Sequence, residues 1–257
     1  MPTALFLSPH LDDVVFSCGG LAATLAQAGW ETVLVTAFTR SVLPATGFAL
    51  ACQLDKGLSP QADYMAIRRA EDLVAAELLG FDEVLWLDLP EAPHRGYESA
   101  PALFAGRRPG DDPALLAVLR HLAVHYAPDL VVAPQGLGNH VDHLVMIDAA
   151  RGAFAAVPTL FYRDTPYAVR APDAPPPEFV AGLKDFAVAV DVGRKVAAAL
   201  AYVSQVPFQF GTPAIAAATL GDFAMREGAG TPAERFRCQS WPRAMPMIWL
   251  GHATRQP

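Results

Sequence analysis

Two short clusters of histidine and aspartate carry the residue types that could do chemistry in this chain. The first lies in Ser8-Pro9-His10-Leu11-Asp12-Asp13, a stretch that directly follows the apolar run at 3–7. An entering helical turn places His10 and Asp13 on one face, while Asp12 points about 100° away. Imidazole nitrogen and carboxylate oxygen are ligands of catalytic zinc, which needs three of them and an open position for water. The spacing therefore indicates two metal ligands and a spare carboxylate, Asp12, as general base.

The second cluster, His140-Val141-Asp142-His143, follows another apolar run at 130–134. Spacing alone leaves the third metal ligand open between His140 and His143. We interpret His140 and Asp142 as a catalytic pair, in which a cationic imidazole stabilises an oxyanion formed on the substrate and then protonates the leaving group. Asp142 would fix the tautomer of His140 and keep it charged. A purely structural hydrogen bond between the two side chains is the alternative.

The first cluster has structural alternatives as well. His10 with Asp12 or Asp13 could cap the helix that follows, which is a common use of aspartate at a first turn. Asp12 could instead accept a hydrogen bond from His140 or His143 and orient it. A second cluster of the same composition, also placed after an apolar run, favours the metal site over these alternatives.

Both clusters stand where a predicted strand turns into a helix, and the strand pattern predicts that they meet. We expect strands at 3–8, 32–38, 84–88, 129–134, 159–162 and 186–190, with a further edge strand at 247–250. Strands that alternate with helices favour an α/β, Rossmann-like, doubly wound and mostly parallel sheet with helices on both faces. In its strand order 3-2-1-4-5, the first and fourth strands are neighbours beside the crevice where ligands bind.

Three loop-rich segments, 40–62, 90–113 and 163–178, should form the rim of this crevice. Such loops carry substrate contacts or subunit interfaces, so a homo-oligomer remains an option. The chain has 257 residues without an internal repeat or a change of composition, and we expect a single domain over 1–257.

Composition argues against several classes of function. No apolar stretch reaches the length of a membrane span, and the chain enters its first strand without a basic leader, so no signal peptide is expected. The net charge of −7 is dispersed, which argues against a nucleic-acid partner. Cys18, Cys52 and Cys238 are scattered and are typical of reduced thiols in a cytoplasmic protein. Gly19-Gly20 come too late for a pyrophosphate turn, which disfavours a dehydrogenase or a methyltransferase.

The two clusters, in this order, resemble those of the LmbE/PIG-L family of zinc-dependent N-acetylglucosamine deacetylases. That family carries an HPDD-type turn after its first strand and an HxDH turn near mid-chain. The resemblance extends over residues 3–205 and includes two weaker features, Arg68-Arg69-Ala70-Glu71 with Leu79-Gly80, and Lys195 with Tyr202-Val203-Ser204-Gln205. Leu11 replaces the usual proline and Val14 a frequent glutamate, so the pocket wall departs from that of the best-known members.

The resemblance implies a zinc site made of His10, Asp13 and His143, with Asp12 as general base. Ferrous iron would fit the same ligands. The implied reaction removes the N-acetyl group from a small N-acetylglucosamine-type conjugate. Two alternatives stay open: a hydrolase of another N-acyl amine, such as a natural-product intermediate, and a non-catalytic sugar- or metal-binding module on the same fold.

Substrate contacts are expected from the mouth of the cleft. Arg68 can reach it to hold a hydroxyl or an anionic group, or Arg69 does so instead, because adjacent helix positions cannot both face inward. Asp164 follows the fifth strand and is a weaker candidate for the same role.

Overall fold

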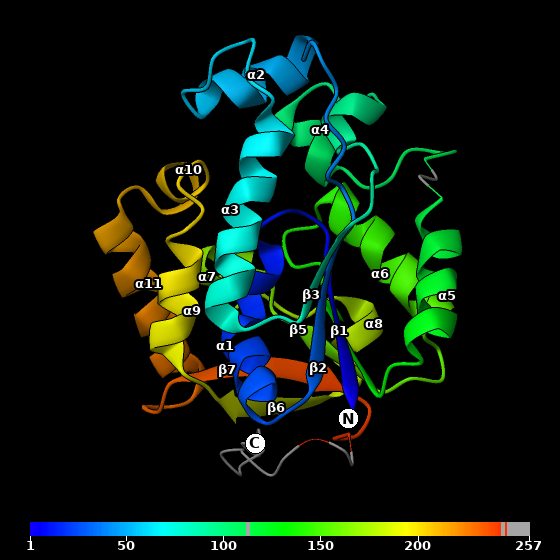
Figure 1. The fold of residues 1–257 in the computed structure, drawn as a ribbon, viewed down its shortest axis with the longest axis vertical. Coiled ribbons are helices and arrows are strands. Elements are labelled where there is room, and N and C mark those ends of the chain that lie inside the picture. Colours follow the sequence, from blue (N-terminus) through cyan, green and yellow to red (C-terminus); the bar gives the residue numbers. More distant parts are fainter. Residues whose placement is uncertain (112–113, 243–244, 246–257) are drawn as a thin grey trace.

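The centre of the molecule is a seven-stranded sheet (Figure 1), formed within the part of the chain that the computed structural model describes, residues 1–111, 114–242 and 245. The strand order is β3-β2-β1-β4-β5-β7-β6. The first five strands are parallel, and β7 pairs antiparallel with both β5 and β6. The strands are β1 (Thr3–Ser8), β2 (Glu31–Thr36), β3 (Glu83–Trp86), β4 (Leu130–Pro134), β5 (Thr159–Tyr162), β6 (Lys184–Ala189) and β7 (Ala233–Cys238).

Helices cover both faces of the sheet (Figure 1). One layer consists of α1 (Asp13–Gln27), α3 (Tyr64–Leu79), α9 (Val192–Ala199) and α11 (Pro213–Glu227). The other consists of α5 (Leu115–Tyr126), α6 (Val141–Ala153) and α8 (Glu178–Ala181). Short helices lie in the loops: α2 (Gly47–Asp55), η1 (Ala92–Arg95, a 3-10 turn), α4 (Ala100–Phe104), α7 (Tyr167–Arg170) and α10 (Val206–Phe210).

Strand β1 shows why the first run of the sequence is continuously apolar. Ala4 and Phe6 pack into the core beneath α1 and α3, whereas Leu5 and Leu7 pack into the core beneath α5 and α6. A strand buried on both faces needs apolar residues at every position, since neighbouring side chains point in opposite directions. This burial fixes β1 at the centre and brings its carboxyl end beside that of β4.

The predicted fold class and the order of the first five strands are confirmed. Strand β7 was not predicted, because three of its six residues are charged and two of these are adjacent, which leaves no apolar run. The helical pattern from Val192 to Gln205 predicts one helix, but α9 ends at Ala199 and α10 is a separate helix that begins at Val206. The expected edge strand at 247–250 lies outside the described residues. Among the described residues, no helix combines the length and the apolarity needed to cross a bilayer.

Candidate metal centre

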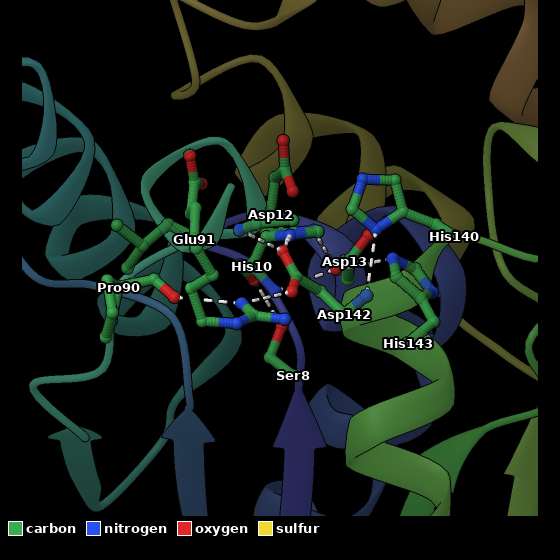
Figure 2. Close-up of polar contacts among 12 residues, drawn as sticks. Ser8, His10, Asp12, Asp13, Pro90, Glu91, His140, Asp142 and His143 are labelled. Atoms are coloured by element: carbon green, nitrogen blue, oxygen red, sulfur yellow. Dashed lines mark hydrogen bonds and ion pairs between the residues drawn. The ribbon is translucent and has the colours of Figure 1, made fainter. Parts of the chain in front are cut away.

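The turns after β1 and β4 meet at one edge of the sheet and bring the two histidine clusters together (Figure 2). His10 lies in the turn before α1, Asp13 is the first residue of α1, and His140 and His143 lie at the start of α6. Ring nitrogen atoms of His10, His140 and His143 all lie within 4.8 Å of one another. The predicted convergence of two turns distant in sequence is confirmed.

The donor atoms of His10, Asp13 and His143 have the spacing of a ligand shell. Asp13 Oδ2 lies 3.2 Å from His10 Nδ1 and 3.3 Å from His143 Nε2. Two ligands held at about 2.0–2.1 Å from one tetrahedral zinc ion are themselves separated by about 3.3 Å. His143 Nε2 is buried and makes no hydrogen bond within the described residues. A buried polar atom without a partner is costly, and a metal ion would satisfy it.

Each of the two histidine ligand candidates is held from behind by a carboxylate. His10 Nε2 donates to Asp142 Oδ2 at 2.9 Å, and His143 Nδ1 donates to Asp164 Oδ1 at 2.7 Å. When these imidazoles are neutral, the bonded nitrogen carries the proton and the other nitrogen has its lone pair free for a metal. A carboxylate behind a histidine is the arrangement that orients metal-ligating imidazoles.

The electrostatics of the site also suit a cation. Burial opposes the charged form of His143, yet Asp13 and Asp164 raise its pKa to about 9. Burial likewise opposes charge on Asp13, but His143 and His10 hold the pKa of its carboxyl well below the usual range. Without a metal, a protonated His143 balances the negative charge of the neighbouring carboxylates. A divalent ion would supply this positive charge instead and release the proton.

The expected contact of Asp164 with substrate is wrong, because this side chain is fully buried behind His143. Its exposed fraction is 0%. Besides His143, it accepts hydrogen bonds from the backbone N–H groups of Gln135 and Leu137, at 3.1 and 3.0 Å. Asp164 therefore ties the β4–α6 loop to the histidine ring and does not reach the cleft.

The expected pairing of Asp142 with the His140 ring is also wrong. The Asp142 carboxylate accepts hydrogen bonds from His10, from the Ala92 N–H at 3.1 Å and from Arg95 Nη1 at 2.7 Å. His140 Nδ1 instead accepts from the backbone N–H of Asp142 at 3.2 Å. Burial, together with the neighbouring His10, lowers the pKa of His140 to about 3. The His140 ring is thus neutral at pH 7, and its proton is on Nε2.

Asp12 faces away from the ligand candidates, as its position in the turn predicted (Figure 2). It precedes α1 but makes no capping hydrogen bond, and its φ of 145° is a conformation that non-glycine residues rarely adopt. Its carboxylate lies 3.5 Å from Arg68 Nη2. Burial raises its pKa to about 7, Arg68 opposes this, and Asp13 adds to it. Asp12 therefore does not cap α1.

Arg68 rather than Arg69 faces the cleft. Its guanidinium donates to Glu91 Oε1 at 2.6 Å and to the Leu11 carbonyl at 2.9 Å. Arg69 donates to the Thr39 carbonyl at 2.6 Å and supports the loop after β2. Arg68 thus holds the turn that carries Asp12.

Sequence reasoning missed Arg95, which links the 90–113 loop to the site. It binds Asp111 through two nitrogens, at 2.8 and 2.9 Å, and reaches Asp142 with a third. No local pattern identified this arginine, since both of its partners are distant along the chain.

A cleft of about 540 Å³ opens over the two clusters. All three predicted rim segments contribute to its walls, which confirms that prediction, and α10 adds a wall that was not predicted. Side chains from the rim and from α10 include Phe48, Lys56, Glu91, Leu103, Phe104, Tyr167, Arg170 and Phe208.

The family comparison covers the part of the chain that holds both clusters. The PIG-L family, described as GlcNAc-PI de-N-acetylase, matches residues 5–154, which is more than half of the chain. This chain belongs to the PIG-L family. The match includes His10, Asp13, His140 and His143. Asp164 and α10 lie beyond it.

Named deacetylases are similar to this PIG-L family member. A 2'-N-acetylparomamine deacetylase from Streptomyces fradiae is 37% identical over 171 residues, which are 64% of this chain and 57% of that protein. This chain thus matches less than two thirds of that relative. The zinc-inhibited form of a teicoplanin deacetylase has a TM-score of 0.78 at 26% identity, over 92% of this chain and 97% of that one. An A40926 pseudoaglycone deacetylase has a TM-score of 0.77 at 28% identity, over 91% and 96%.

Proposed function

We propose that this PIG-L family member is a zinc-dependent N-deacetylase that removes the acetyl group from an amino sugar in a small conjugate. One observation carries the proposal: His143 Nε2 is buried 3.3 Å from Asp13 Oδ2 and has no hydrogen bond to any described residue, in a site that also holds the buried Asp12 carboxylate. The relatives named as deacetylases of paromamine and teicoplanin derivatives support the reaction class.

In this proposal His10 Nδ1, Asp13 Oδ2 and His143 Nε2 hold the zinc ion. His140 is a less suitable ligand, because its Nδ1 already accepts a backbone hydrogen bond and its Nε2 carries the proton. When bound, zinc polarises the amide carbonyl and lowers the pKa of a water molecule. Asp142 and Asp164 keep the two histidine ligands in orientation.

The neighbouring residues supply proton transfer and oxyanion stabilisation. Asp12 accepts the proton of the attacking water, since its carboxylate faces the cleft and does not contact the ligand candidates. His140, as a neutral donor through Nε2–H, stabilises the negative charge that develops on the carbonyl oxygen. Asp12 then passes this proton to the nitrogen of the tetrahedral intermediate as the C–N bond breaks, so that the amine leaves in its neutral form and acetate is released.

The cleft also supports a preference for conjugates with an apolar part. Phe48, Leu103, Phe104 and Phe208 line the cleft, and the Phe104 ring packs edge-on against the His140 ring, with 5.4 Å between their centroids. An N-acetylhexosamine linked to an aromatic or aliphatic group would bury that group against these side chains. We also propose a cytoplasmic location, which the unpaired state of all three cysteines supports.

The test is acetate release by the purified protein after chelation and reloading with zinc or ferrous iron. The substrates are N-acetylglucosamine, its phenyl glycoside and N-acetylated aminoglycosides. We expect release only from metal-loaded protein and at a higher kcat/KM for the phenyl glycoside than for the free sugar. A metal-loaded protein that releases no acetate from any of these compounds contradicts the proposed reaction, while metal-independent release contradicts the metal assignment.

A further inference from the structure

Helix α1 is broken one turn after the candidate metal centre. Cys18 has a φ of −138° and a ψ of 25°, which divide α1 into a short segment at 13–17 and a longer one at 19–27. Helix α1 contains no proline, so the break is not a proline kink. A break leaves backbone N–H and C=O groups without helical partners, and these groups must be satisfied elsewhere because the region is buried.

A buried ion pair from distant elements satisfies them. Lys195 of α9 donates from Nζ to the Ser17 carbonyl at 3.0 Å, at the end of the first segment. Glu234 of β7 accepts from the N–H groups of Gly20 and Leu21, at 2.9 and 2.8 Å, at the start of the second. The two side chains lie 2.9 Å apart and are 2% and 4% exposed. Each charge has the sign that a helix end of that polarity favours.

The second glycine of the Gly19-Gly20 pair makes room for this arrangement. A Cβ atom at Gly20 would lie 2.6 Å from Val190 Cβ and 2.9 Å from Glu234 Oε1. A Cβ atom at Gly19 would lie 3.2 Å from Leu79 Cδ1, at the end of a flexible side chain, and 3.6 Å from Lys195 Cγ, an ordinary van der Waals contact. A side chain at Gly20 would thus collide with both Val190 and the Glu234 carboxylate, whereas a methyl group at Gly19 requires only a small shift of the Leu79 side chain.

The short segment is attached to both halves of the metal centre. It begins with Asp13, and Ser17 at its other end accepts a hydrogen bond from the Thr165 N–H at 3.0 Å. Thr165 directly follows Asp164, the carboxylate behind His143. The position of segment 13–17 therefore sets where the Asp13 carboxylate and the Asp164–His143 pair stand relative to each other.

The geometry points to a positioning role for the Lys195–Glu234 pair: by holding the break in α1, it aims Asp13 at the metal position. This inference rests on the proposed metal centre. Neither residue contacts the cleft, so neither is a catalytic residue. Because of the break, the segment that carries Asp13 can take a different direction from the longer segment, which packs on the sheet.

The test compares Gly20→Ala with Gly19→Ala, two identical changes at adjacent positions. Zinc affinity is measured by chelator competition, the ligand geometry by the absorption spectrum of the cobalt-substituted protein, and the mobility of 13–21 by amide hydrogen exchange of the metal-free protein. We expect Gly20→Ala and Glu234→Gln to lower zinc affinity about tenfold or more, to change the cobalt spectrum and to speed exchange over 13–21. Gly19→Ala should resemble the wild type in all three.

The outcomes separate this inference from the proposed function. If the wild type binds zinc and Asp13→Asn weakens binding, the metal centre stands. If folded Gly20→Ala and Glu234→Gln proteins then keep wild-type affinity and spectrum, the positioning role is wrong. If Gly20→Ala is insoluble, Glu234→Gln decides alone, and failure of both to fold assigns the pair to folding and overturns the inference. A wild type that binds no zinc overturns the metal centre itself.

Discussion

Two buried polar clusters lie along α1, and they differ in whether their polar atoms are satisfied. At the Lys195–Glu234 pair, the charged groups bond to each other and to three backbone groups of the broken helix. At the metal centre, His143 Nε2, Arg68 Nε and Thr165 Oγ1 are buried and have no hydrogen-bond partner in the part of the chain that the structure describes. A closed network suits a structural role, whereas an incomplete one marks a place where something else must bind.

Among the substitutions that test this comparison, removal of a candidate metal ligand should have the largest effect on zinc binding and activity. His143→Ala deletes the unsatisfied nitrogen, and we expect stoichiometric zinc and nearly all acetate release to be lost while the fold persists. Asp13→Asn should weaken zinc binding less, with activity partly restored by excess zinc. Elemental analysis and a zinc titration of the rate measure both. Full zinc content in the His143→Ala protein is the result that would contradict the ligand assignment.

Asp12→Asn should separate chemistry from binding. The amide cannot accept a proton from water, so we expect kcat to fall about 100-fold or more with zinc content unchanged. The measurement is kcat alongside elemental analysis, with Asp13→Asn as the matched control one residue away. Loss of zinc in Asp12→Asn and its retention in Asp13→Asn would show that the two roles are reversed.

Asp164→Asn tests whether the carboxylate behind His143 acts on the metal or on the substrate. Because Asp164 is buried and bonded to His143, we expect zinc affinity to fall about 10- to 100-fold, with KM at saturating zinc unchanged. Chelator competition and steady-state kinetics give the two quantities. A raised KM with normal zinc affinity would restore the substrate contact that the sequence predicted.

The buried carboxylate of Asp72, which lies outside both clusters, should affect stability rather than activity. Burial raises its pKa to about 6, although hydrogen bonds from Tyr202 and Trp86, at 2.6 and 2.9 Å, oppose the shift. The folded state therefore holds this proton more tightly than the unfolded state, and the free energy of unfolding falls as pH rises from about 4 to 6.

The Asp72 contribution amounts to at most about 3 kcal/mol at pH 7. Asp72→Asn cannot ionise, so its stability relative to the wild type should rise by up to that amount between pH 4 and pH 7. Denaturant unfolding at both pH values measures it. A constant difference between the two proteins would show that Asp72 does not titrate in this range.

The sequence by itself determined the features that depend on local geometry. The spacing of His10 and Asp13 predicts a shared face because three residues span nearly one helical turn. The apolar strands predict the sheet order, since a parallel sheet with crossover helices has few permitted arrangements. From these, the meeting of the two clusters and the rim of the cleft followed correctly.

Only the tertiary structure decided which side chain bonds to which. Asp142 lies beside His140 in sequence, yet its carboxylate bonds to His10 and Arg95, because an entering helix turns neighbouring side chains in different directions. Asp164 was placed at the correct end of the sheet, but its burial depends on how the loop after β4 closes over it. The partners of the α1 break come from α9 and β7, and a contact across such sequence distances depends on packing, which local patterns do not specify.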